Sequence, residues 1–365
     1  MLQQITLALL IAAASPSVEM PELGQMRLDQ VQYVETHNSY HLAPDAELLA
    51  WLLRGSYADG EWTGPRLARA IDYSNLPLTT QLDRGIRAFE LDVHDDPAGD
   101  RFVRPGYIQR LRAAGITPRQ PWDSSGAMRR PGFKTIHKAD YDPRSTCPVF
   151  ADCLRAIGEW SRAHPGHVPL LLMIEVKRDR RSKCVGLCAD GWRRLEGELV
   201  HGLGRERIFA PAGIGPTWPT IDALRGRVLV FLLDAEDSAR SYRAAVGDHG
   251  LLFTGPRPGK GVPLADTGER WAILPRSDDP RIATARARGM LVYTRADAET
   301  EQARAGDTTT RDRALASGAQ IVSTDYPVPD PRFSGYAVRF AGGRFVRCNP
   351  VTGGACRPVR AATLE

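Results

Sequence analysis

Four short polar segments contain the residue types needed to bind a cation and to move protons. They span residues 35–41, 90–94, 134–138 and 174–177, and each follows a run of apolar residues. Together they provide histidines, carboxylates, a carboxamide and lysines. Carboxylate and amide oxygens are the ligands that hard divalent cations prefer, and histidine is the commonest acid–base catalyst. This set of residues suits phosphodiester cleavage, provided that the four segments meet in space.

We predict one cation site built from oxygen ligands. Glu90 and Asp92 are two residues apart, so a β-strand would place both side chains on the same face. Buried carboxylates need a compensating positive charge, which a cation would supply. The alternative is that they pair with some of the many arginines. The predicted metal ligands are Asn38, Glu90, Asp92 and Glu175, and the predicted ion is Ca²⁺, with Mg²⁺ as the alternative.

Two histidines are the predicted proton carriers. His37 and His137 each follow a predicted strand and stand close to predicted metal ligands. One would take a proton from the nucleophile, and the other would deliver a proton to the leaving oxygen. His41 and His94 are further candidates in the same segments.

Three other side chains are predicted to bind the substrate. Lys177 lies two residues beyond Glu175, shares its face of the strand and could hold a phosphate oxygen. Tyr293 and Arg295 close a late strand and could bind a polyol or a phosphate from across the pocket, the alternative being simple packing.

Short β-type runs alternate with helical patterns along the chain, which predicts an α/β fold with a parallel sheet. About eight such units predict a TIM-type (β/α)8 barrel, in which catalytic residues lie at the C-terminal ends of the strands. We therefore expect the four polar segments to converge from four successive strands. Nine strand candidates are present, so at least one is accessory or misassigned: Val31–Thr36, Ala88–Val93, Lys134–Ile136, Pro169–Val176, Val228–Leu233, Leu251–Thr254, Trp271–Leu274, Met290–Thr294 and Ile321–Ser323. The helix candidates, several of which end at glycine, are Pro77–Arg84, Cys147–Ala163, Asp190–Leu203, Pro280–Arg288 and Thr309–Ser317.

Two regions interrupt this alternation. Residues 95–131 are rich in Pro, Gly and Arg and are predicted to form a long insertion between the second and third strands, over the active face. The tail over 327–365 is predicted to form a β-hairpin with a turn at Gly342 and Gly343, capping the barrel; a small binding module is the alternative. We predict a signal peptide over 1–20 and a single catalytic barrel domain over 21–365.

Composition and the first residues indicate an exported, ordinary globular protein. The chain of 365 residues is 42% hydrophobic and 25% charged, with a net charge of +5 from 48 basic and 43 acidic residues. This mild excess does not indicate nucleic-acid binding but is compatible with an anionic substrate or a lipid surface. The apolar run Ile5–Ala14 has the length of a signal-peptide core, although no Lys or Arg precedes it. We expect a secreted, monomeric protein.

The six cysteines fall into three local pairs, as expected of an exported protein with disulfides. Proximity favours pairing of nearest neighbours among the fifteen possible connectivities. Zinc binding is the competing interpretation, but none of the spacings is a C-x₂-C knuckle. The nearest-neighbour pairs are Cys147 with Cys153, Cys184 with Cys188, and Cys348 with Cys356.

At these residues the chain resembles the phosphoinositide-specific phospholipase C superfamily, and in particular its secreted bacterial, calcium-dependent members. The resemblance covers about residues 30–356. The motifs that carry it, in order, are Thr36–Tyr40, Glu90–Val93, a later predicted strand followed by His137, and Ile174–Lys177. Further matches are Arg144–Cys147, Ala163–His167, Ser323–Pro327 and Arg347–Pro350.

The resemblance implies a TIM-type barrel that cleaves phosphatidylinositol-type lipids to diacylglycerol and a cyclic inositol phosphate, which water can then open. It implies that the inositol 2-hydroxyl attacks phosphorus and that His137 protonates the leaving glycerol oxygen. His37 would stabilise the phosphate or accept the hydroxyl proton, a role that Glu90 could also fill. The extra membrane-targeting domains of the animal signalling enzymes have no counterpart in the sequence, so membrane contact is expected from the barrel rim, at residues 95–131 or at the basic run 177–181.

Two other functions compete with this one. A glycerophosphodiester phosphodiesterase shares the barrel and the metal but acts on a soluble, deacylated diester. Asn38 directly after the first histidine and the motifs of the tail favour the phospholipase. A catalytically silent barrel that binds lipid or glycan is the other alternative, and the competent residues at all predicted catalytic positions argue against it.

Overall fold

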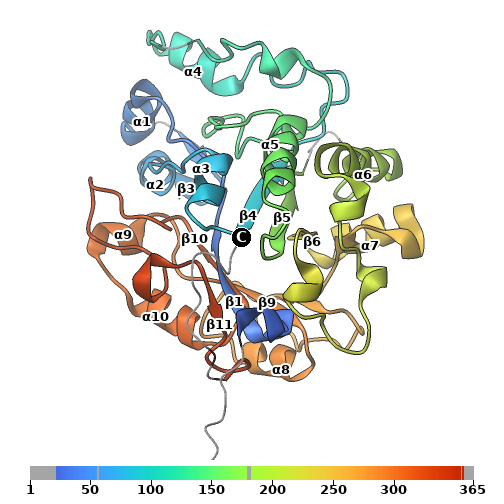
Figure 1. Cartoon of the computed structure of the whole chain (residues 1–365). Helices are drawn as coiled ribbons and strands as arrows, with labels where there is room; N and C mark the ends of the chain where they lie inside the picture. Colours follow the sequence, from blue (N-terminus) through green and yellow to red (C-terminus); the bar gives the residue numbers. More distant parts are fainter. Residues whose placement is uncertain (1–21, 56, 120, 179–181, 355, 357–365) are drawn as a thin grey trace, which may run out of the picture.

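The computed structural model describes residues 22–354 and 356, apart from residues 56, 120 and 179–181. Eight parallel strands lie in the order β7-β6-β5-β4-β1-β10-β9-β8, with helices around them (Figure 1). Within the described residues no strand ladder joins β7 to β8, but the Ile273 amide donates to the Pro256 carbonyl at 3.0 Å and narrows this seam. The barrel is nearly closed. Its strands are β1 (Val31–Thr36), β4 (Ala88–Val93), β5 (Leu170–Val176), β6 (Val228–Leu232), β7 (Leu252–Phe253), β8 (Trp271–Ile273), β9 (Leu291–Arg295) and β10 (Ile321–Thr324).

These strands confirm the predicted barrel, and the one surplus candidate is Lys134–Ile136. Instead of a barrel strand, this segment makes isolated bridges from Lys134 to His94 and to Val149. The segment is buried for a different reason than a barrel strand would be. The Lys134 side chain is fully buried and its Nζ lies 3.1 Å from Asp96 Oδ2. The prediction that His137 follows a third barrel strand is therefore wrong. The segment belongs to the long connection between β4 and β5.

Alternate side chains of the strands point into the barrel or out toward the helices. Tyr33, Met173 and Phe231 belong to the interior cluster, while their neighbours Val34, Leu172 and Val230 pack in a separate cluster with residues of the helices. A strand residue and the second one after it share a face. Near the C-terminal ends of the strands, the inward positions change from apolar to polar.

The outer helices include the five predicted ones. In α5 the apolar residues 150, 153, 154 and 157 recur at helical spacing and are buried. The helix α6 ends where Gly204 takes a positive φ of 89°. The helices are α1 (Ala46–Leu53), α2 (Gly64–Ala70), α3 (Leu78–Asp83), α4 (Gly106–Ala113), α5 (Phe150–Ala163), α6 (Ala189–Leu203), α7 (Glu236–Val246), α8 (Arg281–Ala287), α9 (Glu301–Ala305) and α10 (Thr309–Ala316).

Close contact between α5 and α6 leads to a stability prediction. A Cβ atom on Gly158 would lie 2.2 Å from the Gly202 carbonyl oxygen, so the helices must separate to accept one. We expect Gly158→Ala to lower the free energy of unfolding by about 1–3 kcal/mol. Gly197→Ala, in α6 with nothing within 4 Å of the new atom, should instead raise it by up to about 1 kcal/mol. Urea unfolding measures both, and equal effects would contradict this packing.

The insertion between β4 and β5 packs against the connection that follows β1. Tyr107 and Leu111 of α4 are buried with Leu48 and Leu52 of α1 and Leu67 of α2. Figure 1 shows α4 at the outer edge of the molecule. A small antiparallel pair, β2 (Ala58–Asp59) with β3 (Trp62–Thr63), precedes α2.

The last described part of the tail, from β11 onward, lies beside the N-terminal end of β1. The predicted turn is present, because the Phe340 amide donates to the Arg344 carbonyl at 2.7 Å across Gly342 and Gly343. The hairpin is limited to this one bridge, and the next strand, β11 (Val346–Cys348), pairs antiparallel with the first half of β1. The two short helices Leu23–Gln25 and Leu28–Gln30 close the same end.

The three predicted disulfides are confirmed: Cys147–Cys153, Cys184–Cys188 and Cys348–Cys356. Among the described residues no helix combines the length and the apolar character that a membrane span requires. The predicted signal peptide lies outside the described residues.

Candidate active site

Three adjacent strands bring most of the predicted site together. β5, β4 and β1 are neighbours in the sheet, and Asp92 lies opposite Glu175 in the β4–β5 register. One ligand atom each of Glu90, Asp92 and Glu175 lies within 4.8 Å of the others. The structure thus places three of the four predicted metal ligands in one cluster, which we call the carboxylate cluster.

The fourth predicted ligand, Asn38, reaches the carboxylate cluster through a tyrosine. The Tyr40 hydroxyl lies 2.7 Å from Asp92 Oδ2 and 3.2 Å from Asn38 Oδ1. Asn38 has a positive φ of 44°, which is uncommon for a residue with a side chain and turns the chain sharply after β1. Its Nδ2 donates to the Tyr73 hydroxyl at 3.2 Å. These contacts fix the carboxamide beside Asp92.

A lysine rather than an arginine lies beside the carboxylate cluster. Lys177 Nζ is 2.8 Å from Asp92 Oδ2 and 2.9 Å from Glu175 Oε1. Burial nevertheless raises the pKa of Glu90 well above its ordinary value, and Glu35, Asp92 and Glu175 raise it further. Burial also raises the pKa of Asp92, although the Lys177 ammonium opposes it. The Lys177 ammonium and the Arg295 guanidinium therefore do not offset the effect of burial on Glu90 and Asp92. By contrast, Lys177 and Arg257 lower the pKa of Glu175 to about 2.

The carboxylate cluster fits a calcium ion. Glu90 Oε1 and Asp92 Oδ1 are buried without a hydrogen-bond partner among the described residues. Such acceptors are costly to bury unless something positive meets them. Carboxylate and carboxamide oxygens are the ligand type that Ca²⁺ takes, and the cluster contains neither sulfur nor nitrogen ligands.

Beneath the carboxylate cluster, Glu35 leads to a prediction about pH. It lies opposite Ser323 in the β1–β10 register and is fully buried. Burial raises the pKa of Glu35 from 4.5 to about 8, although the Ser323 hydroxyl and Arg295 oppose it. The folded protein therefore keeps a proton that the unfolded chain releases. Stability present below pH 4.5 is lost as the pH rises toward 8.

Glu35→Gln cannot titrate and should remove this loss. We expect the free energy of unfolding of the wild type to fall, relative to that of the variant, by a few kcal/mol over this range, since one pKa unit corresponds to about 1.4 kcal/mol. Urea unfolding at several pH values with a chelator present tests this. Parallel pH curves for the two proteins would contradict it.

His37 is held by an aspartate and an arginine. Its Nδ1 lies 2.6 Å from Asp325 Oδ1, just beyond β10, so Nδ1 carries the proton. Its Nε2 accepts from Arg295 Nη1 at 2.9 Å and lies 3.7 Å from Glu90 Oε1. Burial and the Arg295 guanidinium lower the pKa of His37 below 6.5, which outweighs the opposite effect of Asp325. His37 is therefore neutral, with a lone pair on Nε2.

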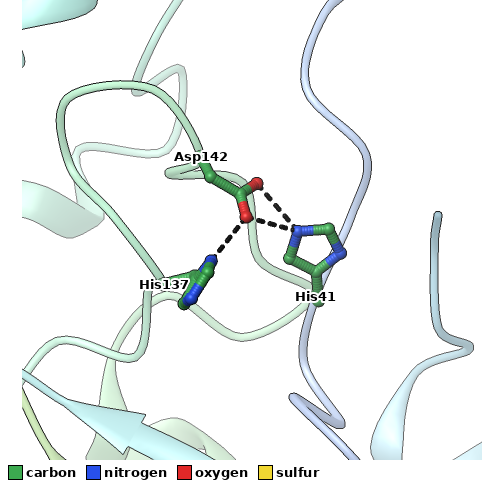
Figure 2. A group of neighbouring side chains, drawn as sticks. All are labelled: His41, His137 and Asp142. Atoms are coloured by element: carbon green, nitrogen blue, oxygen red, sulfur yellow. Dashed lines mark hydrogen bonds and ion pairs between the residues drawn. The ribbon is translucent and has the colours of Figure 1, made fainter. Parts of the chain in front are cut away.

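His137 is held by a second aspartate, from the loop that it belongs to. Its Nδ1 lies 2.6 Å from Asp142 Oδ2, and the same carboxylate contacts His41 Nε2 at 2.8 and 2.9 Å (Figure 2). The His137 side chain is 23% exposed, whereas His41 and Asp142 are fully buried. Burial and the Lys177 ammonium lower the pKa of His137, and Asp142 opposes them. His137 thus has the same anchorage as His37, with Asp92 and Lys177 close enough to affect its charge.

The group formed by His41, His137 and Asp142 is a hydrogen-bonded network rather than a metal site. Its atoms are 2.6–2.9 Å apart. Ligands about 2.0–2.2 Å from one tetrahedral ion lie more than 3 Å from each other. The distances are those of hydrogen bonds to an ionised carboxylate.

The remaining predicted residues have structural contacts as well. Tyr293 is buried, and its hydroxyl donates to Glu90 Oε2 at 3.4 Å. Arg295 also contacts Asp325, at 3.3 Å. His94 donates from Nε2 to the carbonyls of Ile136 and His137, at 3.0 and 3.2 Å, so it supports the loop that carries His137.

Sequence reasoning missed the two aspartates that hold the histidines. Asp325 follows a predicted strand, so the rule of polar residues at strand ends could have found it. Asp142 lies in an irregular loop and contacts His41, 101 residues away in the sequence. No periodicity in the sequence predicts this contact.

Comparisons with known proteins agree with the barrel fold and indicate the family. The sequence profile of the family described as "Phosphoinositide phospholipase C, Ca2+-dependent" matches residues 26–350. In structure, the chain is similar to the calcium-dependent phosphoinositol-specific phospholipase C of a Pseudomonas species in its apo form, with a TM-score of 0.55 and 15% identity over 92% of this chain and 100% of that one. The form of that enzyme solved with myo-inositol gives a TM-score of 0.54 and 16% identity over the same shares. No curated protein is similar enough in sequence to match.

The structural likeness supports the barrel, and the family profile spans nearly the whole of it. The family profile does not favour the glycerophosphodiester phosphodiesterase or the silent barrel. The chain belongs to the calcium-dependent phosphoinositide phospholipase C family and, as the family profile shows, is a phosphoric diester hydrolase that cleaves phosphatidylinositol-type lipids.

Proposed function

We propose that the C-terminal mouth of the barrel cleaves phosphatidylinositol to diacylglycerol and a cyclic inositol phosphate, with Ca²⁺ as the required ion. The observation that carries the proposal is the arrangement of two histidines, each held by its own aspartate, around the carboxylate cluster. The carboxylate cluster is close enough to affect both histidines, since Glu175 acts to raise the pKa of His37 and Asp92 acts to raise the pKa of His137.

His37 would act as the general base. Asp325 holds the Nδ1 proton, so Nε2 can accept the proton of the inositol 2-hydroxyl while that oxygen attacks phosphorus. Arg295, which donates to Nε2 in the structure, would turn to a phosphate oxygen as the substrate enters. Glu90 Oε1, 3.7 Å from Nε2, is the alternative acceptor.

His137 would act as the general acid. The bond between phosphorus and the glycerol oxygen breaks, and this oxygen takes the proton of Nε2 as diacylglycerol leaves. Asp142 holds the Nδ1 proton and stabilises the charged ring that must form before this transfer. Water can then open the cyclic phosphate by the reverse sequence of proton transfers.

Asn38, Glu90, Asp92 and Glu175 would hold the calcium ion. When bound there, Ca²⁺ would neutralise charge on the phosphate and make the hydroxyl more acidic. Lys177, released from Asp92 and Glu175, would be free to contact a phosphate oxygen. Tyr293 and Arg295 border the cluster from β9, and a related fold has been solved with myo-inositol, which supports an inositol head group.

Turnover measurements test the proposal. Phosphatidylinositol and glycerophosphoinositol are each incubated with the purified protein, with added Ca²⁺ or with a chelator, and the products are followed by phosphorus NMR. We expect a calcium-dependent cyclic inositol phosphate from the lipid. Glycerol phosphate released only from the deacylated diester would indicate the phosphodiesterase instead, and turnover that persists in the chelator would exclude the calcium requirement.

Exposed valines on the rim support contact with a membrane surface. The apolar side chains of α4 are buried against α1, but Val185 and Val262, on the connections after β5 and β7, are 50% and 52% exposed. We expect Val185→Asp combined with Val262→Asp to weaken binding to phosphatidylinositol vesicles about tenfold or more, since two apolar contacts are replaced by charges. Turnover of a soluble short-chain phosphatidylinositol should not change.

A matched control lies at the other end of the barrel. Val351, beyond β11, is 50% exposed, and Val351→Asp should leave vesicle binding unchanged. An equal effect at both ends would exclude a rim-specific contact. The basic run 177–181, also predicted to meet the membrane, has residues 179–181 outside the described part.

Export and a monomeric state complete the proposal. The three disulfides support export, since such bonds persist in oxidising compartments. All the proposed catalytic and metal-binding side chains come from one barrel, which supports a working monomer.

A further inference from the structure

The mechanism above leaves one buried histidine of the active site unused. His41 is fully buried and follows β1, four residues after His37. A buried imidazole loses its hydration, and such a loss is tolerated when both ring nitrogens find partners. The contacts of His41 therefore indicate what it does.

Both ring nitrogens of His41 face acceptors. Nδ1 lies 3.1 Å from the Tyr73 carbonyl oxygen, which can only accept, and Nε2 lies 2.8 and 2.9 Å from the two oxygens of Asp142. His41 therefore donates to Asp142. Figure 2 shows the Asp142 carboxylate between His41 on one side and His137 on the other.

The ring of His41 is also fixed in orientation. It stacks on the Tyr73 ring, with centroids 4.2 Å apart and an angle of 20° between the planes. The hydroxyl of the same tyrosine accepts from Asn38 Nδ2 at 3.2 Å, which ties this support to a proposed metal ligand. His41 thus approaches Asp142 from a rigid base in the connection after β1.

Asp142 needs such support because of where it lies. It belongs to an irregular loop, and a lone buried carboxylate there would be held only by the partly exposed His137. His41 Nε2 holds both oxygens of the carboxylate, including Oδ2, the oxygen that His137 Nδ1 contacts. If the Asp142 carboxylate could rotate freely, the acceptor of His137 Nδ1 would move, and the direction in which His137 Nε2 points would change with it.

We propose that His41 is a positioning residue, which holds Asp142 so that Asp142 can orient His137 toward the leaving oxygen. The inference rests on the proposed function, in which His137 is the general acid. It assigns His41 no contact with the substrate.

Leaving-group dependence tests the proposal. Phosphatidylinositol has an alkoxide leaving group, which needs a proton. A 4-nitrophenyl ester of inositol phosphate releases 4-nitrophenolate, which leaves without one. His41→Asn keeps a donor for the Tyr73 carbonyl but cannot reach Asp142, and we expect it to lower kcat on phosphatidylinositol about 30- to 100-fold with KM unchanged. On the nitrophenyl ester the loss should stay below about fivefold.

Two variants serve as controls. His41→Gln places an amide donor where Nε2 was and should restore most of the turnover of phosphatidylinositol. His164 has a similar environment outside the site, because it stacks on Trp160 at 4.1 Å and its Nδ1 lies 2.8 Å from the Trp160 carbonyl. His164→Asn should change neither substrate's turnover.

The outcomes separate this inference from the proposed function. If His137→Ala shows the leaving-group selectivity and His41→Asn lowers both substrates equally, or neither, His41 is structural and the proposal fails alone. If His137→Ala shows no selectivity, the general-acid role fails and the positioning role with it.

A measurement on the wild type covers the case in which His41→Asn does not fold. In protein labelled with ¹⁵N at histidine, NMR should show a bound proton on both ring nitrogens of His41. A His41 nitrogen without a proton would overturn the proposal, because one of the two hydrogen bonds would then be absent.

Discussion

Asp325→Asn is expected to lower kcat on phosphatidylinositol by three to four orders of magnitude, about 10³- to 10⁴-fold, with little change in calcium binding. Asp325 Oδ1 lies 2.6 Å from His37 Nδ1 and fixes the tautomer in which Nε2 carries the lone pair. An asparagine can offer an amide hydrogen to Nδ1, which moves the proton to Nε2 and leaves no base for the hydroxyl. Steady-state turnover by phosphorus NMR measures the loss.

The pKa of Asp325 agrees with this role. Burial alone would raise it, but His37 and Arg295 lower the pKa of Asp325 to about 2, so the carboxylate is ionised at any working pH. The control is Asp330→Asn, the same chemical change in the same loop, at a residue that bonds Arg332. If Asp325→Asn retained more than a tenth of the activity, the orientation of His37 would not depend on this contact.

The second large effect is expected at Asp92. Its Oδ2 already accepts from Tyr40 and Lys177, while Oδ1 is buried without a partner among the described residues. Asp92→Asn removes one negative charge from the carboxylate cluster without changing its shape. Changes in residues that only support metal ligands cost about 10- to 100-fold in affinity, so the loss of a ligand charge should raise the calcium Kd by about 100-fold or more.

Titration calorimetry measures this affinity, and a calcium dependence of turnover adds a stricter test. High calcium should restore part of the activity of Asp92→Asn but none of that of His37→Ala, since only the first variant is limited by ion binding. Asp190→Asn, on the exposed first turn of α6, is the control for charge alone. An unchanged Kd in Asp92→Asn would place the ion elsewhere.

The sequence allowed the strands to be predicted where a buried run ended in charged residues. β1 and β4 begin and end at the predicted residues, and the alternation that places Glu90 and Asp92 on one face follows from strand geometry alone. The same rule failed at residues 134–136, because three buried residues look alike in a strand and in a bridged loop. There the burial of Lys134 depends on its ion pair with Asp96, which no local pattern predicts.

The parts of the site that could not be predicted are those made by the tertiary fold. Asp325 could have been found, since it continues the inward face of Ser323 beyond β10. Asp142 could not, because only the folding of the long β4–β5 connection brings it to His41 and His137. The sequence therefore indicates which residues react, but not which residues hold them.

The pairing of β1 has a consequence for how the molecule is made. Gln32 in this first strand bonds the Ala319 carbonyl before β10 and accepts from Arg347 in β11, over separations of 287 and 315 residues. Such distant pairings form slowly, because a long loop must close first. During synthesis β1 therefore cannot complete its pairing until β10 and β11 have been made. A chain that ends before β10 has no partner for half of β1. His37, which directly follows β1, can therefore take its position in the site only after β10 and Asp325 have been synthesised.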